Sequence, residues 1–468
     1  MRSETETGNL YEQRIQTIRL ETMNKIPDIR YAASGMRDKN EMKKYNYPTN
    51  WEDICKRPTF QKEELEETVK TILDTVQENG DTALLDYAQQ FDKVELTSIT
   101  VSKKEIAEAN DLVSIKLKAA IQLAAGNITK FHTAQTEEVS VIETTEGVNC
   151  WRKSVGIEKV GLYIPGGTAP LFSTILMLGI PAKLAGCKEI VLCTPPQKDG
   201  SINPAILYAA KLVGVTQIFK AGGAQAIGAM AYGTESVPQV YKIFGPGNQF
   251  VTKAKELIQT EGIAIDMPAG PSEVLVIADS SCNPSFVAAD LLSQAEHGAD
   301  SQVILLSDNA QVLSTIEAEL QSQLALLPRK EIAELALENS RSVLLNSIEK
   351  CIELSNFYAP EHLIIASESA AKYADAIVNA GSVFLGNYSC ESAGDYASGT
   401  NHTLPTNGYA RNYSGVSLDS FVRKITFQNL TAKGIQNIGP AIELMAEAEE
   451  LFAHKNAVTL RLKSLENV

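Results

Sequence analysis

The stretch VGLYIPGG (160–167) opens the part of the chain that decides the fold. It is a short apolar run that ends in a glycine turn, and the residues of TAPLFSTILMLGIPAKLAG (168–186) then have helical character. The same unit recurs in EIVLCTPP (189–196), QIFKAGG (217–223) and KIFGPG (242–247). Strand, glycine turn and helix repeating at this interval predict a parallel sheet wrapped by helices.

A second series of strands and helices follows. Its strands are expected at EVLVIAD (273–279), SQVILLSD (301–308), HLIIAS (362–367) and GSVFLG (381–386). The predicted fold class is therefore α/β, with two Rossmann-like parallel-sheet domains that have helices on both faces. The segment after Asn412 is expected to be mostly helical, as a small C-terminal dimerisation segment.

Composition limits the possible partners. A chain of 468 residues with 44% hydrophobic residues can bury a large core. Its net charge of −15 repels phosphate backbones and anionic membrane surfaces, so neither nucleic acid nor a membrane is expected as a partner. The apolar run Ile175 to Leu178 is cut off by Gly179, far short of the roughly 20 residues that a bilayer requires.

The predicted location is the cytoplasm. The seven cysteines are scattered and form no C-x-x-C pair, which suits a reducing compartment. The N-terminal residues lack the apolar stretch of a signal peptide, and Met23 is an alternative start.

Candidate catalytic groups gather in the second half, where four of the five histidines lie near carboxylates or amides. His132 has no acid beside it and is interpreted as structural. One metal-compatible active site is predicted from Gln294, Glu296, His297, Glu361, His362, Asp395 and His454.

The helix expected in NPSFVAADLLSQAEHGAD (283–300) has clear end signals. Asn283 and Pro284 suit its start, and Gly298 suits the residue just past its end. Gln294 and His297 are three residues apart, so they share a face, whereas Glu296 points elsewhere. An interaction of His297 with the last-turn carbonyls is an equally good interpretation.

Three further segments each have a plainer alternative. Glu361 and His362 stand at the start of a strand, and both can serve one pocket only if the backbone is irregular there. Asp395 lies in a glycine-containing loop with His402, where a turn-forming role is common. His454 lies on a charged helix, whose ordinary interpretation is a solvated face.

The glycine turns IPGG (164–167), AGGAQ (221–225) and FGPGN (244–248) each follow an expected strand, where open α/β sheets bind ligands. None matches G-x-G-x-x-G with an acid about 20 residues on. Ordinary strand-to-helix turns thus remain the simpler interpretation from spacing alone.

Taken together, these segments resemble the histidinol dehydrogenase family from about residue 55 to the C-terminus. Eight motifs agree in order and type, namely VGLYIPGG, GGAQAIGAMAYGTE, FGPGN, DMPAGPSEVLVIAD, LLSQAEHG, YAPEHL, ESAGDYASGTNH and AHKNAVTLR. Residues 1 to 45 find no firm match.

The resemblance implies a site for one Zn²⁺ per subunit, an NAD site and a substrate site. The implied zinc ligands are Gln294, His297, Asp395 and His454. The implied substrate contacts are Ser272, Gln294, His297, His362, Asp395, His402, Glu449 and His454. The implied NAD contacts are Tyr163, Gln225 and Asn248.

The resemblance also implies a reaction and an assembly. L-Histidinol is oxidised through L-histidinal to L-histidine with two NAD, the last step of histidine biosynthesis; His362 serves as the base for the alcohol, and Glu361 activates the water. A homodimer is implied in which His454 and Glu449 reach across the interface. The expected parts are an extension (1–45), a first α/β domain with the metal and catalytic residues (46–160 and 275–412), an NAD-binding second domain (161–274) and a helical tail (413–468).

Two other classes of protein are alternatives for the same residues. A zinc hydrolase of a small nitrogenous metabolite would use Glu361 to activate a metal-bound water and would not bind NAD. A binding protein with a structural zinc would leave the Glu361–His362 pair without a purpose. The three glycine turns at strand ends argue against the hydrolase.

Overall fold

The computed structural model describes residues 41–47, 50–58, 62–166 and 170–466. Met23 and most of the expected N-terminal extension lie outside the described residues, as does Gly167 of the first glycine turn. In the described part of the chain, no helix has both the length and the apolar character to cross a membrane.

A five-stranded sheet, parallel throughout, forms the first α/β unit, with strand order β6-β5-β4-β7-β8. Its strands are β4 (Lys159–Tyr163), β5 (Glu189–Thr194), β6 (Gln217–Lys220), β7 (Lys242–Phe244) and β8 (Ala264–Ile265). The connecting helices are α6 (Phe172–Leu184), α7 (Pro204–Val213), α8 (Gly223–Tyr232) and α9 (Gln249–Thr260). In chain order the strands run 3-2-1-4-5, so the order reverses between β4 and β7.

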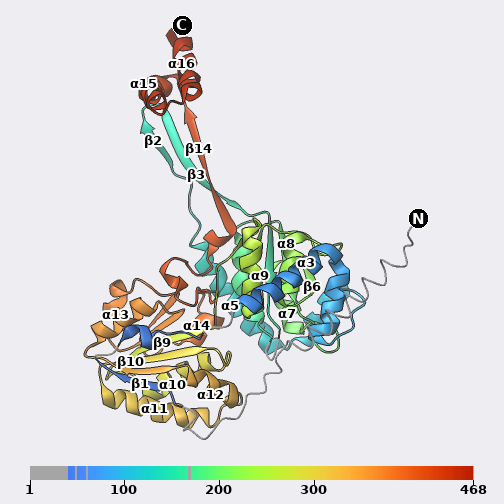
Figure 1. The fold of residues 1–468 in the computed structure, drawn as a ribbon, viewed down its shortest axis with the longest axis vertical. Helices are drawn as coiled ribbons and strands as arrows, with labels where there is room; N and C mark the ends of the chain where they lie inside the picture. The colour runs from blue at the N-terminus through green and yellow to red at the C-terminus, as the bar shows by residue number, and fades with distance from the viewer. Residues whose placement is uncertain (1–40, 48–49, 59–61, 167–169, 467–468) are drawn as a thin grey trace. The chain divides into compact units, whose positions relative to one another are not determined.

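A six-stranded parallel sheet repeats this topology, with strand order β1-β11-β10-β9-β12-β13. Its strands are β1 (Lys43–Asn46), β9 (Glu273–Ala278), β10 (Gln302–Ser307), β11 (Arg341–Leu344), β12 (His362–Ala366) and β13 (Ser382–Leu385). Its helices are α10 (Pro284–Ala295), α11 (Ala310–Leu324), α12 (Lys330–Glu338), α13 (Ile348–Tyr358) and α14 (Glu391–Tyr396). Here the order reverses between β9 and β12, with β1 added at the edge (Figure 1).

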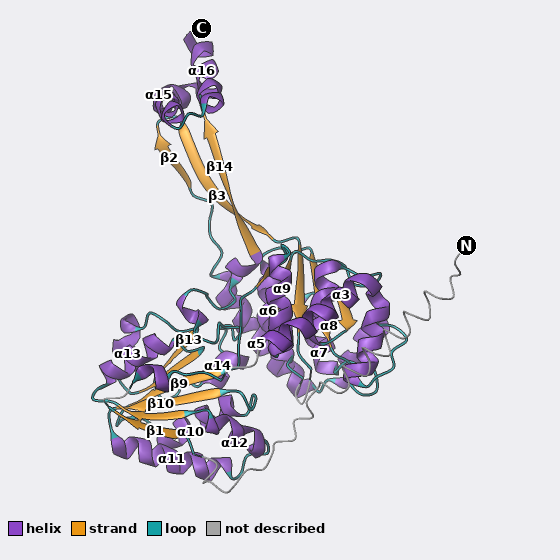
Figure 2. Ribbon diagram, viewed as in Figure 1, coloured by secondary structure: helices purple, strands orange, loops and turns teal. Residues whose placement is uncertain are grey.

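Helices cover both faces of each parallel sheet (Figure 2). Along β9, Val274 and Val276 enter one hydrophobic core, while Leu275 and Ile277 enter the core on the opposite face. Successive strand residues point to opposite faces, so a strand covered on both sides is apolar throughout. The α/β fold class with two Rossmann-like sheets is confirmed.

The N-terminal helices belong to the five-stranded unit. Helices α3 (Lys62–Tyr87), α4 (Lys103–Leu112) and α5 (Ile115–Thr133) pack against α8, α7 and α6. The assignment of 46–160 to the domain with the metal and catalytic residues was therefore wrong, because these helices pack their apolar faces against the five-stranded unit. The limit of the extension at 45 was also too late, since β1 starts at Lys43 and pairs with β11.

A three-stranded antiparallel sheet, in the order β14-β3-β2, precedes the last two helices. It consists of β2 (Val141–Thr145), β3 (Val148–Gly156) and β14 (Val422–Leu430), and α15 (Ala432–Ala448) and α16 (Phe452–Glu466) follow. The C-terminal helices are as predicted, but the segment 413–468 also contains a strand. β14 pairs with β3 along its whole length, a long-range partner that the local pattern did not reveal.

Short helices complete the described structure. They are α2 (Trp51–Ile54), η1 (Ala88–Asp92), η2 (Ala370–Ala376), η3 (Tyr409–Arg411) and η4 (Leu418–Phe421).

Candidate active site

The candidate active site lies at the amino ends of β9 and β12, the pair where the strand order of the six-stranded sheet reverses. The backbone N–H of Glu273 donates to Glu361 Oε2 at 2.8 Å. The carbonyl of Glu273 accepts from His362 Nδ1 at 3.3 Å. One residue of β9 thus holds both predicted catalytic side chains through its backbone.

The local backbone lets two adjacent residues serve one site. Ala359 has a left-handed conformation (φ 56°) and ends α13, and Pro360 and Glu361 follow before β12 begins. Glu361 is therefore outside the regular strand, and its Oε2 lies 3.7 Å from His362 Nδ1. Both side chains are buried.

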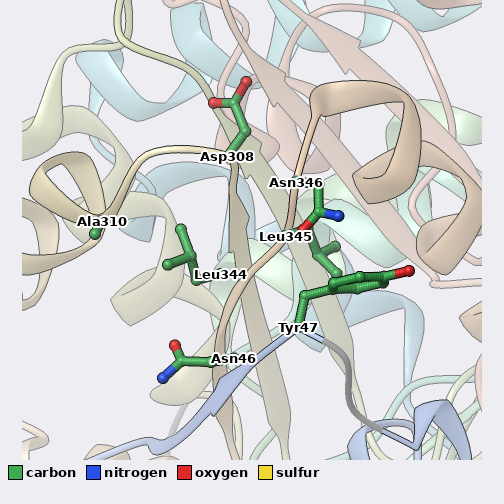
Figure 3. A pocket seen from close by; sticks show the side chains of 7 residues that line it. All are labelled: Asn46, Tyr47, Asp308, Ala310, Leu344, Leu345 and Asn346. Atoms are coloured by element: carbon green, nitrogen blue, oxygen red, sulfur yellow. The ribbon is translucent and has the colours of Figure 1, made fainter.

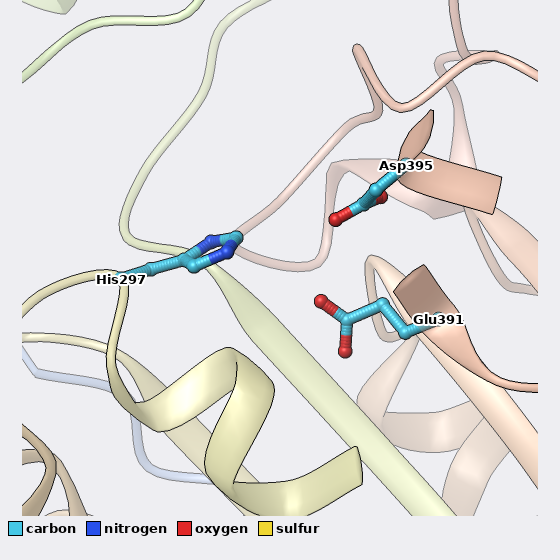
Figure 4. Close-up of side chains that lie close together, drawn as sticks. All are labelled: His297, Glu391 and Asp395. Atoms are coloured by element: carbon cyan, nitrogen blue, oxygen red, sulfur yellow. The ribbon is translucent and has the colours of Figure 1, made fainter. Parts of the chain in front are cut away.

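Helix α14 brings two carboxylates to the same place. Glu391 and Asp395 are four residues apart and so share a helix face. Asp395 Oδ1 lies 3.6 Å from His362 Nε2. In Figure 4 both carboxylates point toward the ring of His297, and ligand atoms of the three residues lie within 4.8 Å of one another.

The last turn of α10 supplies the amide. The predicted start is confirmed, since Asn283 caps the helix and Pro284 opens it; the helix ends at Ala295, so His297 lies just beyond it. The Gln294 side chain is fully buried. Its surroundings place the amide nitrogen toward Glu391, where it donates to Oε1 at 2.5 Å and Oε2 at 3.2 Å. The Gln294 oxygen then takes the amide position that lies 3.4 Å from His297 Nδ1.

Burial and unlike charges shift the ionisation of this cluster. Burial raises the pKa of Glu361 to about 7 and that of Glu391 to about 8, although His362 opposes both shifts. Burial alone would lower the pKa of His362, but the carboxylates of Glu361, Glu391 and Asp395 outweigh it and raise the value to about 10. The same interaction with His362 lowers the pKa of Asp395 against the effect of burial. Buried carboxyl groups gathered around one imidazole therefore stabilise a positive charge among them.

The donor set fits a divalent metal ion. Within the described chain, His362 Nε2 and Asp395 Oδ1 are both buried without a hydrogen-bond partner. The buried Asp395 oxygen without a partner is costly, and a cation would satisfy it. An imidazole nitrogen, carboxylate oxygens and an amide oxygen are ligands that zinc accepts.

The loop after α14 joins this cluster to the five-stranded unit. His402 Nδ1 contacts the Asp395 carbonyl at 2.9 Å, and its Nε2 contacts the Thr174 hydroxyl of α6 at 3.0 Å. Asn401 donates to the Met177 carbonyl, also on α6. The amino edge of the six-stranded sheet is thereby attached to α6, the helix that follows β4 of the five-stranded sheet.

The predicted NAD contacts lie at the carboxyl edge of the five-stranded sheet. Tyr163 ends β4, and its hydroxyl accepts from the N–H of Gly223 at 3.0 Å. Gln225 is buried in the first turn of α8, and Asn248 caps α9 through the N–H groups of Phe250 and Val251. These residues follow β4, β6 and β7, the edge at which such sheets bind ligands.

The other predicted residues are spread out. Ser272 is half-buried and directly precedes β9, next in sequence to Glu273, whose backbone holds Glu361 and His362. Glu449 caps α15 and His454 lies on α16, both exposed. The main contacts of α16 are with α15, so one chain does not bring His454 to the cluster. His132 is buried on α5 and contacts Gln135, apart from the site.

Glu391 is the cluster member that sequence reasoning missed. The signal was present, because the motif ESAGDYASGTNH places Glu391 four residues before Asp395.

A hollow of about 340 Å³ lies at the opposite, carboxyl edge of the six-stranded sheet and contains none of the predicted residues (Figure 3). It is lined by Asn46, Tyr47, Asp308, Ala310, Leu344, Leu345 and Asn346.

Two linked parallel α/β units hold a buried cluster of imidazole and carboxylate groups, an arrangement suited to proton transfer, and the comparisons with known proteins make the chain an oxidoreductase that acts on an alcohol or aldehyde. The family model for histidinol dehydrogenase matches residues 55–462, and the chain belongs to this family.

Relatives and a solved structure agree with this assignment. The chain is 61% identical over 426 residues to the histidinol dehydrogenase of Bacteroides thetaiotaomicron, which covers 91% of this chain and 100% of that protein. It is 51% identical over 434 residues to that of Yersinia pestis, covering 90% and 97%. The crystal structure of histidinol dehydrogenase from Elizabethkingia anophelis superposes with a TM-score of 0.89 at 63% identity, covering 92% of this chain and 100% of that one.

Proposed function

We propose that this chain oxidises L-histidinol through L-histidinal to L-histidine, with four electrons passing to two NAD, as the last step of histidine biosynthesis. The carrying observation is the Glu361–His362 pair, buried together on Glu273 beside Asp395. A base for an alcohol and a base for a water are both needed, and this pair supplies two groups of different type. The names of the relatives support the substrate.

His362 takes the hydroxyl proton in the first oxidation. Its Nδ1 donates to the Glu273 carbonyl, which leaves Nε2 to accept a proton on the side of Asp395. The carboxylates raise the pKa of His362 to about 10, so His362 is neutral only when their charge is offset. A cation held by Asp395 beside His362 would offset that charge, which couples the proposed metal site to the base.

Glu361 acts in the second oxidation. The aldehyde must add water before a second hydride can leave, and Glu361 would remove the water proton. Its pKa of about 7, raised by burial, suits a base that works near neutral pH. Bound NAD supplies the chemistry of hydride acceptance in both oxidations.

The metal is proposed to be Zn²⁺, one per subunit. Gln294, His297 and Asp395 would hold it, with His454 as the fourth ligand. When bound, zinc would fix the substrate by its nitrogen atoms and so orient the alcohol carbon. Ser272, His402 and Glu449 are proposed as further substrate contacts.

NAD is proposed to bind at the carboxyl edge of the five-stranded sheet. Tyr163, Gln225 and Asn248 are the proposed contacts, from three different strand ends. The loop that carries His402 leads from this unit to the catalytic cluster, which supports transfer of hydride between the two.

A homodimer is proposed because His454 and Glu449 are exposed in one chain. Their helices also expose large apolar side chains: Leu444, Met445, Phe452 and Leu460 are each 59% to 69% exposed. A second copy that covers this surface would remove apolar area from water and bring His454 to the partner's cluster.

The seven free cysteines support a cytoplasmic location.

The test is the stoichiometry of turnover. With L-histidinol and excess NAD, we expect two NADH per histidinol, and chelation should abolish activity that added zinc restores. Glu361→Gln should yield about one NADH per histidinol, because the alcohol step does not use this carboxylate.

One NADH per substrate in the wild type would remove Glu361 from the proposed mechanism. Turnover that is insensitive to chelation would remove the metal. Absence of NAD binding to the purified protein would favour the hydrolase instead.

A further inference from the structure

We propose that Arg57 is a positioning residue for the Glu361–His362 pair and acts through Glu273. Arg57 contacts neither catalytic side chain in the described structure. It binds the side chain of the residue whose backbone holds both of them. The inference rests on the proposed function, in which Glu361 and His362 are the two bases.

The first contact is an ion pair with Glu273. Arg57 Nε lies 2.5 Å from Glu273 Oε1, and a terminal nitrogen donates to Oε2 at 3.0 Å. The two side chains are 14% and 3% exposed, so solvent hardly screens them. The N–H of Asn407 donates to Oε1 at 3.0 Å as well. The planar fork of arginine fits both carboxylate oxygens at once, which fixes Glu273 in direction as well as position.

The second contact fixes the segment that leads to Glu361. Arg57 donates to the Tyr358 carbonyl at 2.9 Å, and its guanidinium stacks 3.9 Å from the centre of the Tyr358 ring. Tyr358 ends α13 immediately before Ala359, the left-handed residue that turns the chain toward Glu361. Arg57 therefore joins the start of β9 to the turn before β12.

These contacts bear on the ionisable groups of both steps. The Glu273 carbonyl can only accept, so it holds the proton of neutral His362 on Nδ1 and leaves Nε2 free to act as the base. The Glu273 N–H fixes the orientation of the Glu361 carboxylate. A displacement of Glu273 would misplace both bases together, and misplacement of about 1 Å costs on the order of 100-fold in rate.

The experiment compares Arg57→Met with Arg57→Lys and with Arg411→Met. Arg411 is the matched control, because it donates to the Phe357 carbonyl of the same helix and stacks on an aromatic ring, yet makes no contact with Glu273. We expect kcat for Arg57→Met to fall roughly 10- to 100-fold, with little change in KM for L-histidinol or in zinc content. Guanidinium ion should restore part of the lost activity, and Arg57→Lys should retain an intermediate rate.

A second readout is independent of turnover. In zinc-loaded protein labelled with ¹⁵N-histidine, the His362 signal, assigned with His362→Gln, should report one neutral tautomer with Nδ1 protonated. Arg57→Met should lose that preference, whereas Arg411→Met should keep it. Circular dichroism and the urea midpoint establish that each variant is folded.

An unchanged kcat and an unchanged His362 signal in folded Arg57→Met would overturn the proposal. A loss of kcat that guanidinium does not restore, together with a retained tautomer, would assign Arg57 a purely structural role and would overturn it too. Failure of the wild type to oxidise L-histidinol would instead refute the proposed function, and the tautomer measurement would still test Arg57.

Discussion

Burial and charge have opposite effects on the pKa values of the few buried side chains that surround His362. Burial favours the neutral carboxyl groups of Glu361 and Glu391, while the nearby carboxylates favour the charged imidazole of His362. Each of these three groups therefore holds its proton to a higher pH in the folded chain than in the unfolded chain. Asp395, His297 and His402 shift the other way, because their pKa values are lowered.

The first prediction concerns the stability of the metal-free protein. Glu361, Glu391 and His362 have raised pKa values, so between about pH 5 and pH 8 these three groups bind more protons in the folded state than in the unfolded state. Their contribution to the free energy of unfolding should therefore fall as pH rises through this window. Glu391→Gln should make this fall smaller, because the amide does not titrate.

Urea unfolding of the metal-free protein at several pH values measures this effect. Glu296→Gln is the control, since Glu296 caps the end of α10 next to His297 but lies outside the cluster. An equal pH dependence in Glu391→Gln and the wild type would contradict the assignment of a raised pKa to Glu391.

At the scale of elements, the turns after the strands of the five-stranded sheet are crowded. Gly245 follows β7 with φ 132°, a conformation that L side chains rarely adopt. A Cβ atom added there would overlap the carbonyl of Tyr163, the last residue of β4. The close approach of β4 and β7 at the point where strand order reverses therefore depends on this glycine.

Gly245→Ala is predicted to lower both stability and NAD affinity. Backbone strain and overpacking should each cost about 1–3 kcal/mol, and the shift of Tyr163 should disturb the proposed NAD site. Gly262→Ala is the matched control: Gly262 has φ 96° but open space around an added Cβ, so only the strain term applies. Thermal unfolding and NAD titration of both variants measure the difference, and equal losses in the two would show that the contact with Tyr163 does not matter.

At the scale of the whole molecule, the proposed metal site of one chain lacks one predicted ligand. His297, Asp395 and Glu391 converge, whereas His454 lies exposed on α16, which packs mainly on α15. A second copy of the chain is the proposed source of the fourth ligand.

His454→Ala is predicted to weaken zinc retention at least about tenfold, without preventing dimer formation. Zinc content after dialysis against a weak chelator measures retention, and sedimentation measures assembly. Asn456→Ala, exposed on the same helix, is the control and should match the wild type. Full zinc retention in His454→Ala would exclude this histidine as a ligand.

Local patterns were sufficient for the parallel strands, the glycine turns and the start of α10. Apolar runs and caps are local signals, since Asn283 and Pro284 act on the helix that they begin. The resemblance of eight ordered motifs then pointed to Gln294, His297, Glu361, His362 and Asp395. Of these, the structure brings Glu361 and His362 together with Asp395, and Gln294 together with His297.

Contacts between distant segments needed the tertiary structure. Four features join residues that are far apart in sequence. They are the pairing of β14 with β3, the packing of helices α3, α4 and α5 on the five-stranded unit, the place of Glu391 in the cluster and the Arg57–Glu273 ion pair. The sequence by itself determined which elements form and which residues have suitable chemistry, because those depend on near neighbours. Only the tertiary structure decided which of them meet, because the strand order within each sheet and the packing of helices against it set those distances.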